Sequence, residues 1–145
     1  MVKVIDRAFL DALWRQASES PRLRMNFDMR NSAADTSQRM LNALQPGTVV
    51  PIHRHENTDE TVICLCGRLE EIIYEEVIEY ERVLTSRVDG VVREFSFKEV
   101  YRQLLCPADG IYGMQIPAGT WHSINVIEPS VIFEAKDGAY KPIAQ

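Results

Sequence analysis

The chain has 145 residues and a mass of 16.6 kDa, the size of one domain that can bury a core without disulfides or metal staples. It carries 16 Lys and Arg against 21 Asp and Glu, and this acidic balance argues against binding to nucleic acids or anionic membranes. Apolar residues make up 46% of the chain, but no apolar run approaches the roughly 20 residues that a membrane span needs.

The first predicted element is an amphipathic helix over residues 6–20, with Asp6 as its N-cap. Pro21 ends it, because a residue before proline disfavours helical geometry. Residues 22–30 then alternate apolar and polar side chains, which predicts a half-buried strand. Residues 32–45 are compatible with a helix or, from Gln38, with a strand, and residue propensity alone slightly favours the helix.

From residue 48 onward the pattern is that of β-structure. Short β-branched and aromatic runs predict strands at 48–52, 61–65, 69–74, 77–84, 91–97, 111–116, 122–127 and 131–135. Asp89-Gly90 lies between two of these runs and predicts a hairpin turn. We interpret the glutamates of one charged stretch as a solvated sheet face: Glu70, Glu71, Glu75, Glu76, Glu79 and Glu81. Many short antiparallel strands indicate an all-β sandwich or closed barrel.

The three histidines of the chain form the candidate site. His53 and His55 are two residues apart, so on a strand they project from the same face and can reach one divalent metal ion. Glu60 begins the next apolar run, and a neighbouring antiparallel strand would bring its carboxylate to the same point. Two histidines and one carboxylate with open positions are the ligands of non-haem Fe(II) sites. His122 follows the turn at 117–119, and we expect it to join the same cluster.

These residues also resemble a known family. The segment Gly47-x5-His53-x-His55-x4-Glu60-x6-Gly67 matches the first cupin motif at every marked position. The second motif is matched less closely by Pro117-x-Gly119-x2-His122 with Asn125. There, Gly110 lies one residue further from the proline than usual, and Asn125 lies one residue nearer to His122.

The cupin resemblance implies a fold and a ligand set. The fold is a double-stranded β-helix, or jelly-roll barrel, and the helix predicted at residues 6–20 precedes it. It implies a single cupin domain over residues 1–145, with the barrel at 22–140. The implied ligands of one divalent transition metal, Zn, Fe, Ni or Mn, are His53, His55, Glu60 and His122.

More narrowly, the chain is similar to WbuC-type cupin metalloproteins, which resemble products of bacterial surface-polysaccharide (O-antigen) gene clusters. The shared segments are Ser20-Pro21-Arg22, Gln38-Arg39, Asn42-Ala43, the segment 51–55, and the ending from Phe133 to Tyr140. This similarity favours a strand for residues 37–45.

Three further side chains are candidates for the cavity. Glu134 lies inside an apolar run, where a buried carboxylate needs a partner, and we predict that it orients a ligand or moves protons. Arg39 and Lys136 are predicted to hold an anionic group of a substrate. We interpret Cys64 and Cys66 as buried hydrophobes with reduced thiols, which fits a cytoplasmic protein whose N-terminus has no signal-peptide core.

The expected function is that of a metal-dependent isomerase or epimerase acting on a sugar or nucleotide-sugar intermediate of surface polysaccharide. Two alternatives stay open on the same ligands: an Fe(II)-dependent dioxygenase, and a non-catalytic metal-dependent binding module or sensor. The expected partner is a small molecule rather than a nucleic acid or a membrane. A homodimer is a further hypothesis, because such barrels often pair through exposed sheets.

Overall fold

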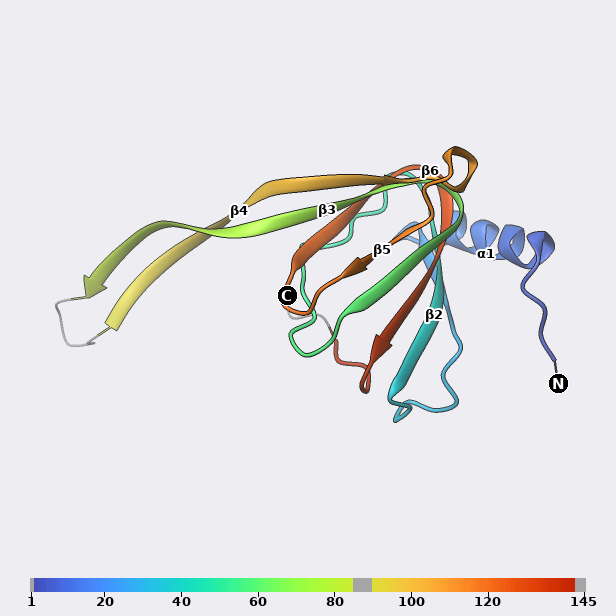
Figure 1. Cartoon of the computed structure of the whole chain (residues 1–145), viewed down its shortest axis with the longest axis horizontal. Helices are drawn as coiled ribbons and strands as arrows, with labels where there is room; N and C mark the ends of the chain where they lie inside the picture. Colours follow the sequence, from blue (N-terminus) through green and yellow to red (C-terminus); the bar gives the residue numbers. More distant parts are fainter. Residues whose placement is uncertain (1, 85–89, 143–145) are drawn as a thin grey trace.

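The computed structural model describes residues 2–84 and 90–142, and it describes side chains for residues 2–78 and 95–142. One helix packs on the outside of an antiparallel β-barrel, and a long two-stranded ribbon extends from the barrel at the opposite end (Figure 1).

Helix α1 spans Arg7–Glu19, which confirms the helix predicted at the N-terminus. The Asp6 carboxylate caps it by accepting a 2.9 Å hydrogen bond from the Phe9 N–H. The helix ends at Ser20, whose backbone is extended before Pro21. Among the residues described, no helix offers the long apolar run that crossing a bilayer demands.

The strands are β1 (Arg24–Asp28), β2 (Ser37–Leu44), β3 (Glu60–Leu84), β4 (Gly90–Leu105), β5 (Gly113–Ile116) and β6 (Trp121–Asp137), with the short 3-10 helix η1 (Pro107–Asp109) between β4 and β5. They pair antiparallel in the order β1-β2-β6-β3-β4, and β5 pairs with the start of β3. This mostly-β architecture confirms the predicted jelly-roll fold, and β2 resolves the ambiguity of residues 32–45 in favour of a strand.

Several predicted short strands are continuous in the structure, because β-bulges stand where turns were expected. The register between β3 and β6 shifts between Cys64 and Leu69, so both strands bend around the barrel without breaking. Gly67 sits in this bulge with φ of 97°. A Cβ atom at Gly67 would lie 2.3 Å from Ser130 Oγ and 2.4 Å from the Pro129 carbonyl oxygen. The close approach of β6 therefore requires glycine there.

The strand predicted at 48–52 is wrong, because residues 48–52 lie in the loop between β2 and β3. Pro51 lacks the N–H that a sheet ladder needs, and only His53 forms an isolated bridge, to His122. The side chain of Val49 is 80% exposed, so its apolar character does not mark a barrel-facing position.

Alternation along the strands separates two apolar layers. The barrel interior holds the first cluster: Leu44, Val62, Cys64, Leu69, Leu105, Ile116, Val126 and Ile132. The second cluster joins the outer face of the sheet to helix α1 and comprises Leu13, Ala17, Leu41, Ala43 and Val131. Side chains in phase with Leu44 or Ile132 therefore face the barrel interior, and their immediate neighbours face the helix.

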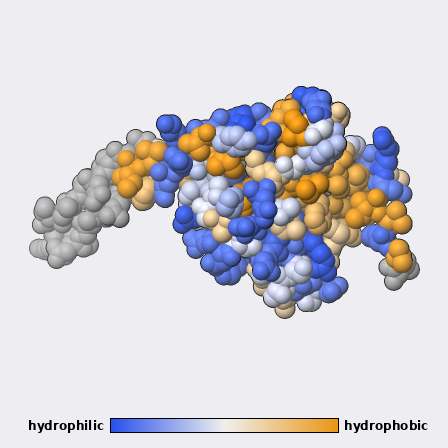
Figure 2. Space-filling view, in the orientation of Figure 1, coloured by the Kyte–Doolittle hydropathy of each residue, from blue (hydrophilic) through white to orange (hydrophobic). Residues whose placement is uncertain are grey.

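The ribbon is formed by the outer parts of β3 and β4. The pairing of β3 with β6 ends at Tyr74, and beyond it β3 pairs with β4 alone. Ile78 and Phe95 face each other across the ribbon and are about half exposed. Hydrophobic atoms are visible along this ribbon in Figure 2. The two strands pair as far as Leu84 and Gly90, which confirms the predicted hairpin, although residues 85–89 lie outside the described residues.

Candidate metal centre

His53 and His55 lie in the loop between β2 and β3 instead of on the regular strand that was predicted. The loop is fastened to the start of β6 by reciprocal backbone hydrogen bonds between His53 and His122, of 3.0 and 2.8 Å. A third bond of 2.8 Å runs from the Gly119 N–H to the His55 carbonyl. This loop thus has a defined position on the sheet, although it has no strand of its own.

The side chains between the histidines and beside them strengthen the attachment. The Arg54 guanidinium stacks over the ring of Trp121, 4.5 Å from its centroid. Trp121 also contacts Phe97, with ring centroids 4.9 Å apart. The Asp59 carboxylate accepts a 2.8 Å hydrogen bond from the Ala118 N–H. The loop is therefore held at both ends.

Glu60 and His122 come from the sheet itself. Glu60 is the first residue of β3 and His122 the second of β6, and their side chains are only 6% and 3% exposed. His122 lies opposite Ile73, and Glu60 lies opposite Lys136. The bends of β3 and β6 bring both side chains to one point in the barrel.

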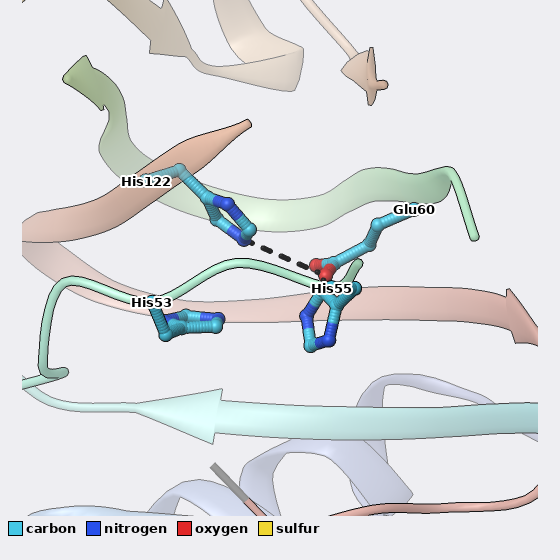
Figure 3. A group of neighbouring side chains, drawn as sticks. All are labelled: His53, His55, Glu60 and His122. Atoms are coloured by element: carbon cyan, nitrogen blue, oxygen red, sulfur yellow. Dashed lines mark ion pairs between the residues drawn. The ribbon is translucent and has the colours of Figure 1, made fainter. Parts of the chain in front are cut away.

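The structure brings the four predicted side chains together, and they point toward one another (Figure 3). One ligand atom from each of His53, His55, Glu60 and His122 lies within 4.8 Å of all the others. Glu60 Oε2 is 2.8 Å from His55 Nε2 and 3.6 Å from His122 Nε2. These separations suit donors that surround one ion, because two ligands at about 2.1 Å from a metal are about 3–4 Å apart.

The hydrogen bonds of two rings leave their other nitrogen available. His53 Nδ1 is 2.8 Å from the Pro51 carbonyl oxygen, and His122 Nδ1 is 2.9 Å from that of Thr120. A carbonyl accepts only from an N–H, so Nδ1 carries the proton and Nε2 keeps its lone pair. Within the described part of the chain, the buried His55 Nε2, His122 Nε2 and Glu60 Oε2 contact one another but have no hydrogen-bond partner outside the cluster. Unsatisfied buried acceptors of this kind fit a cation between them.

The pKa shifts of His53 and Glu60 favour their metal-binding forms, whereas that of His122 favours its protonated ring. Burial, reinforced by His122, lowers the pKa of His53 to about 4, which favours the neutral imidazole. Burial alone would raise the pKa of Glu60, but the facing His122 and His55 and the Lys136 ammonium lower it. Burial alone would lower the pKa of His122, and Glu60 raises it. A carboxylate beside neutral rings is the form that binds a metal.

Glu134 and Lys136 lie beside this cluster, and both face the barrel interior. Lys136 Nζ is 3.7 Å from Glu60 Oε2 and 3.4 Å from Glu134 Oε2. The Asn42 side-chain amide donates a 2.7 Å hydrogen bond to Glu134 Oε1. Burial and the charge of Glu60 raise the pKa of Glu134, although Lys136 and Asn42 oppose the change. Asn42 was not predicted as a site residue, but its inward phase on β2 would have indicated it.

The structure does not bring Arg39 to the metal ligands. Arg39 projects from the same face of β2 as Leu41, which faces helix α1, and Arg39 pairs with Ala135 on β6. Its guanidinium pairs with Asp35 at 3.1 Å and donates to the Ser37 carbonyl at 2.6 Å. The structure therefore places Arg39 on the face of the sheet that looks away from the metal ligands.

Glu71 contradicts its predicted place in a solvated glutamate face. Its side chain is 2% exposed, in phase with buried Leu69 on β3, and faces the barrel interior. Burial and the charges of Glu60 and Glu134 raise its pKa well above the usual value. Neighbouring Glu70 instead meets Arg102 and Asn125 on the other face. The phase of Glu71 relative to Leu69 was the available signal.

Cys64 and Cys66 are free thiols on different faces, because the β-bulge separates them. Cys64 belongs to the barrel cluster, whereas Cys66 packs with the helix-side cluster. Burial raises the pKa of Cys64 to about 12 and also raises that of Cys66. Both therefore behave as small buried hydrophobes, as interpreted from the sequence.

Comparison with known sequences assigns a family. Residues 5–84, more than half of the chain, match the family described as Domain of unknown function (DUF6016). The chain belongs to this family. No curated protein sequence matches this DUF6016 protein.

Solved structures similar to the DUF6016 protein share the cupin fold at low sequence identity. An oxalate oxidase in complex with the substrate analogue glycolate aligns with a TM-score of 0.58 and 12% identity, over 88% of this chain and 57% of its own. KdgF from Halomonas sp. aligns with a TM-score of 0.54 and 15% identity, over 83% and 84%. A cupin 2 domain-containing protein from Halorhodospira halophila aligns at 0.56 and 13%, over 84% and 69%. At these identities the likeness establishes the fold alone.

Proposed function

We propose that this DUF6016 protein binds one divalent transition metal through His53, His55, Glu60 and His122. The observation that carries the proposal is the convergence of four ligand atoms, three of which are buried without a hydrogen-bond partner outside the cluster in the described part of the chain. A bound metal would act as a Lewis acid that polarises a carbonyl or hydroxyl of a substrate.

The remaining interior side chains supply what an isomerase or epimerase needs besides the metal. Glu134 is held between Lys136 and Asn42, which favour its carboxylate form and fix its orientation. It therefore serves as the group that moves a proton on the substrate. Lys136 binds a negatively charged or strongly polar oxygen beside the metal, because its ammonium is the one cation near Glu60 and Glu134 among the contacts described.

We further propose a sugar or nucleotide sugar of bacterial surface polysaccharide as the substrate. Carboxylate, amide and ammonium groups line the interior, and such groups form hydrogen bonds with the hydroxyls of a sugar. The WbuC-type resemblance supports the polysaccharide assignment. So does the shared fold of a solved structure described as the capsular polysaccharide assembling protein CapF from Staphylococcus aureus. That structure has a TM-score of 0.54 and 15% identity, over 85% of this chain and 30% of its own.

The test is elemental analysis of protein purified without added metal, for the wild type and for His53→Ala, His122→Ala and Glu60→Gln. We expect close to one transition-metal ion per chain in the wild type and a loss of most of it in each variant. Glu56→Gln is the matched control, because Glu56 lies in the same loop but is exposed and pairs with Arg54. Full metal content in His53→Ala and His122→Ala would overturn the ligand assignment.

Activity assays on the metal-loaded protein then decide the reaction class. Interconversion within a panel of sugars and nucleotide sugars supports the isomerase or epimerase. Oxygen uptake by the iron-loaded protein would support a dioxygenase instead. Thermal stabilisation by a ligand that is never converted would support a binding module or sensor.

A further inference from the structure

Glu71 lies between the metal ligands and the apolar floor of the barrel. Along the inward face of β3, Leu69 belongs to the apolar cluster, Glu71 follows, and Ile73 then lies opposite His122. Glu71 is therefore a diagonal neighbour of His122, and such positions lie about 7–8 Å apart, within reach of long side chains.

The inward faces of β2 and β6 show the same order of apolar, polar and then ligand-side residues. On β2 and β6, Leu44 and Ile132 belong to the apolar cluster, and Asn42 and Glu134 occupy the next inward positions. Lys136 then reaches Glu60. We call Glu71, Asn42 and Glu134 the polar layer, because they separate the apolar cluster from the ligand residues.

The two carboxyl groups of the polar layer have opposite surroundings. Glu134 accepts a hydrogen bond from Asn42 and faces the Lys136 ammonium. Glu71 is 2% exposed, and its Oε2 has no hydrogen-bond partner in the part of the chain that the structure describes. An unpaired charge is costly in such a place, so Glu71 holds a proton, whereas the Asn42 amide and the Lys136 ammonium act on Glu134 in favour of its carboxylate. The raised pKa of Glu71 agrees with this assignment.

We propose that Glu71 is a second carboxyl group of the substrate site, which donates a hydrogen bond from its protonated form to an oxygen of a small hydroxyl- or carboxylate-bearing ligand at the metal centre. The proposal rests on the proposed function, because that ligand is the one the metal centre would hold. A role in ligand binding explains why the inward position after apolar Leu69 on β3 is occupied by an acidic residue.

In an isomerisation, the two carboxyl groups divide the proton transfers. The Glu134 carboxylate removes a proton from the carbon beside a carbonyl, and the C–H electron pair becomes a new C=C bond. The π electrons of the carbonyl take the Glu71 proton and form an O–H bond. In the second half, Glu134 returns a proton to the neighbouring carbon and Glu71 recovers one from the other hydroxyl. Both groups end as they began.

The binding test uses protein loaded with Co²⁺, whose visible absorption reports the surroundings of the metal, and glycolate as the probe. Glycolate is a small molecule with both a hydroxyl and a carboxylate. Glu71→Leu removes the hydrogen-bond donor of the carboxyl group and replaces it with a side chain of similar volume. We therefore expect glycolate to bind about tenfold more weakly to this variant. Glu71→Gln keeps a donor, and we expect a change of about threefold or less. Glu70→Gln is the matched control, because Glu70 is adjacent but faces away from the barrel interior.

A second measurement identifies the proton itself. Infrared spectra of the metal-free wild type at neutral pH are expected to contain the carbonyl band of a protonated carboxylic acid, and Glu71→Gln is expected to remove it. In the loaded wild type, glycolate is expected to shift this band because the acid donates to it.

Three results would overturn the proposal: wild-type affinity for glycolate in Glu71→Leu, no glycolate binding to the loaded wild type, or an acid band whose intensity is the same in Glu71→Gln as in the wild type. Each can occur while the metal content of the wild type is complete, in which case the metal centre stands and the role of Glu71 fails. Loss of metal from the wild type would instead contradict the metal centre, and the infrared band of the metal-free protein would still test Glu71.

Discussion

The backbones of His53 and His122 are bonded to each other in both directions, with the N–H of each residue donating to the carbonyl of the other. This single bridge joins a loop to the start of β6, and it places two imidazoles with ring centroids 4.3 Å apart. The metal centre is thus built on a rigid strand and on a loop that is tied to that strand. Rigid placement of ligands lowers the cost of organising a metal site.

Metal binding should stabilise the fold, because the four ligands come from three separate segments that the ion would hold together. At a free metal concentration 100 times the dissociation constant, the gain is about 2.7 kcal/mol. For a domain of this size, that gain corresponds to a rise in melting temperature of several degrees. Thermal unfolding with zinc and then with excess chelator measures it. Glu56→Gln should show the full rise and His122→Ala little of it; an equal rise in both would contradict the assignment.

Replacing Gly67 with alanine should destabilise the protein by about 3 kcal/mol or more. The added Cβ meets Ser130 and Pro129 at distances that no relaxed contact has, and φ of 97° is itself strained for alanine. Gly138→Ala is the control, because its φ is 87° but nothing lies within 4 Å of its Cβ. Urea unfolding of both variants separates the steric cost from the backbone cost. Equal losses would show that the bulge relaxes around the new methyl group.

The stability of Glu71→Gln relative to the wild type should increase with pH. Near and below the ordinary value of 4.5, Glu71 is protonated in both states, so the two proteins differ little. Above it the unfolded wild type loses this proton while the folded protein, with its raised pKa, keeps it. The wild type therefore loses stability as pH rises toward the folded pKa, by up to about 1.4 kcal/mol per pH unit.

Urea unfolding of the metal-free proteins between pH 4 and 8 measures this difference, with Glu70→Gln as the baseline for a glutamate replaced on the other face. A stability difference between Glu71→Gln and the wild type that stays constant with pH would show that Glu71 is not held in its protonated form.

Lys136→Met should destabilise the metal-free protein by about 3–5 kcal/mol, because it leaves the buried carboxyls of Glu60 and Glu134 without their cation. A bound metal supplies positive charge at Glu60, so the loss should be smaller in the loaded protein. Unfolding with and without zinc measures both losses. The double variant Lys136→Met/Glu134→Gln should recover part of the stability, and no recovery would mean that the lost packing of the lysine stem dominates.

The motif spacing together with the cupin resemblance predicted which four side chains meet. The signals were a histidine pair, a carboxylate at the start of the next apolar run and a third histidine after a Pro-Gly turn, and the structure brings all four side chains together. The N-terminal helix could also be predicted from the sequence, because its N-cap and the spacing of its apolar residues are local properties of residues 6–20.

The sequence pattern did not reveal how the strands continue or which polar side chains are buried. Gly67 marks a bulge inside a continuous strand because β6 lies against it, and residues 48–52 form no strand because none of them pairs with another strand in the described structure. Only the adjacent His53 forms a bridge, to His122. Glu70 and Glu71 lie on opposite faces of β3 by strand alternation, and the packing of β3 in the barrel decides which of the two faces is the interior. Local preferences thus specify the elements and the ligands. The burial of a charge depends on contacts between distant strands, which a single strand's pattern does not contain.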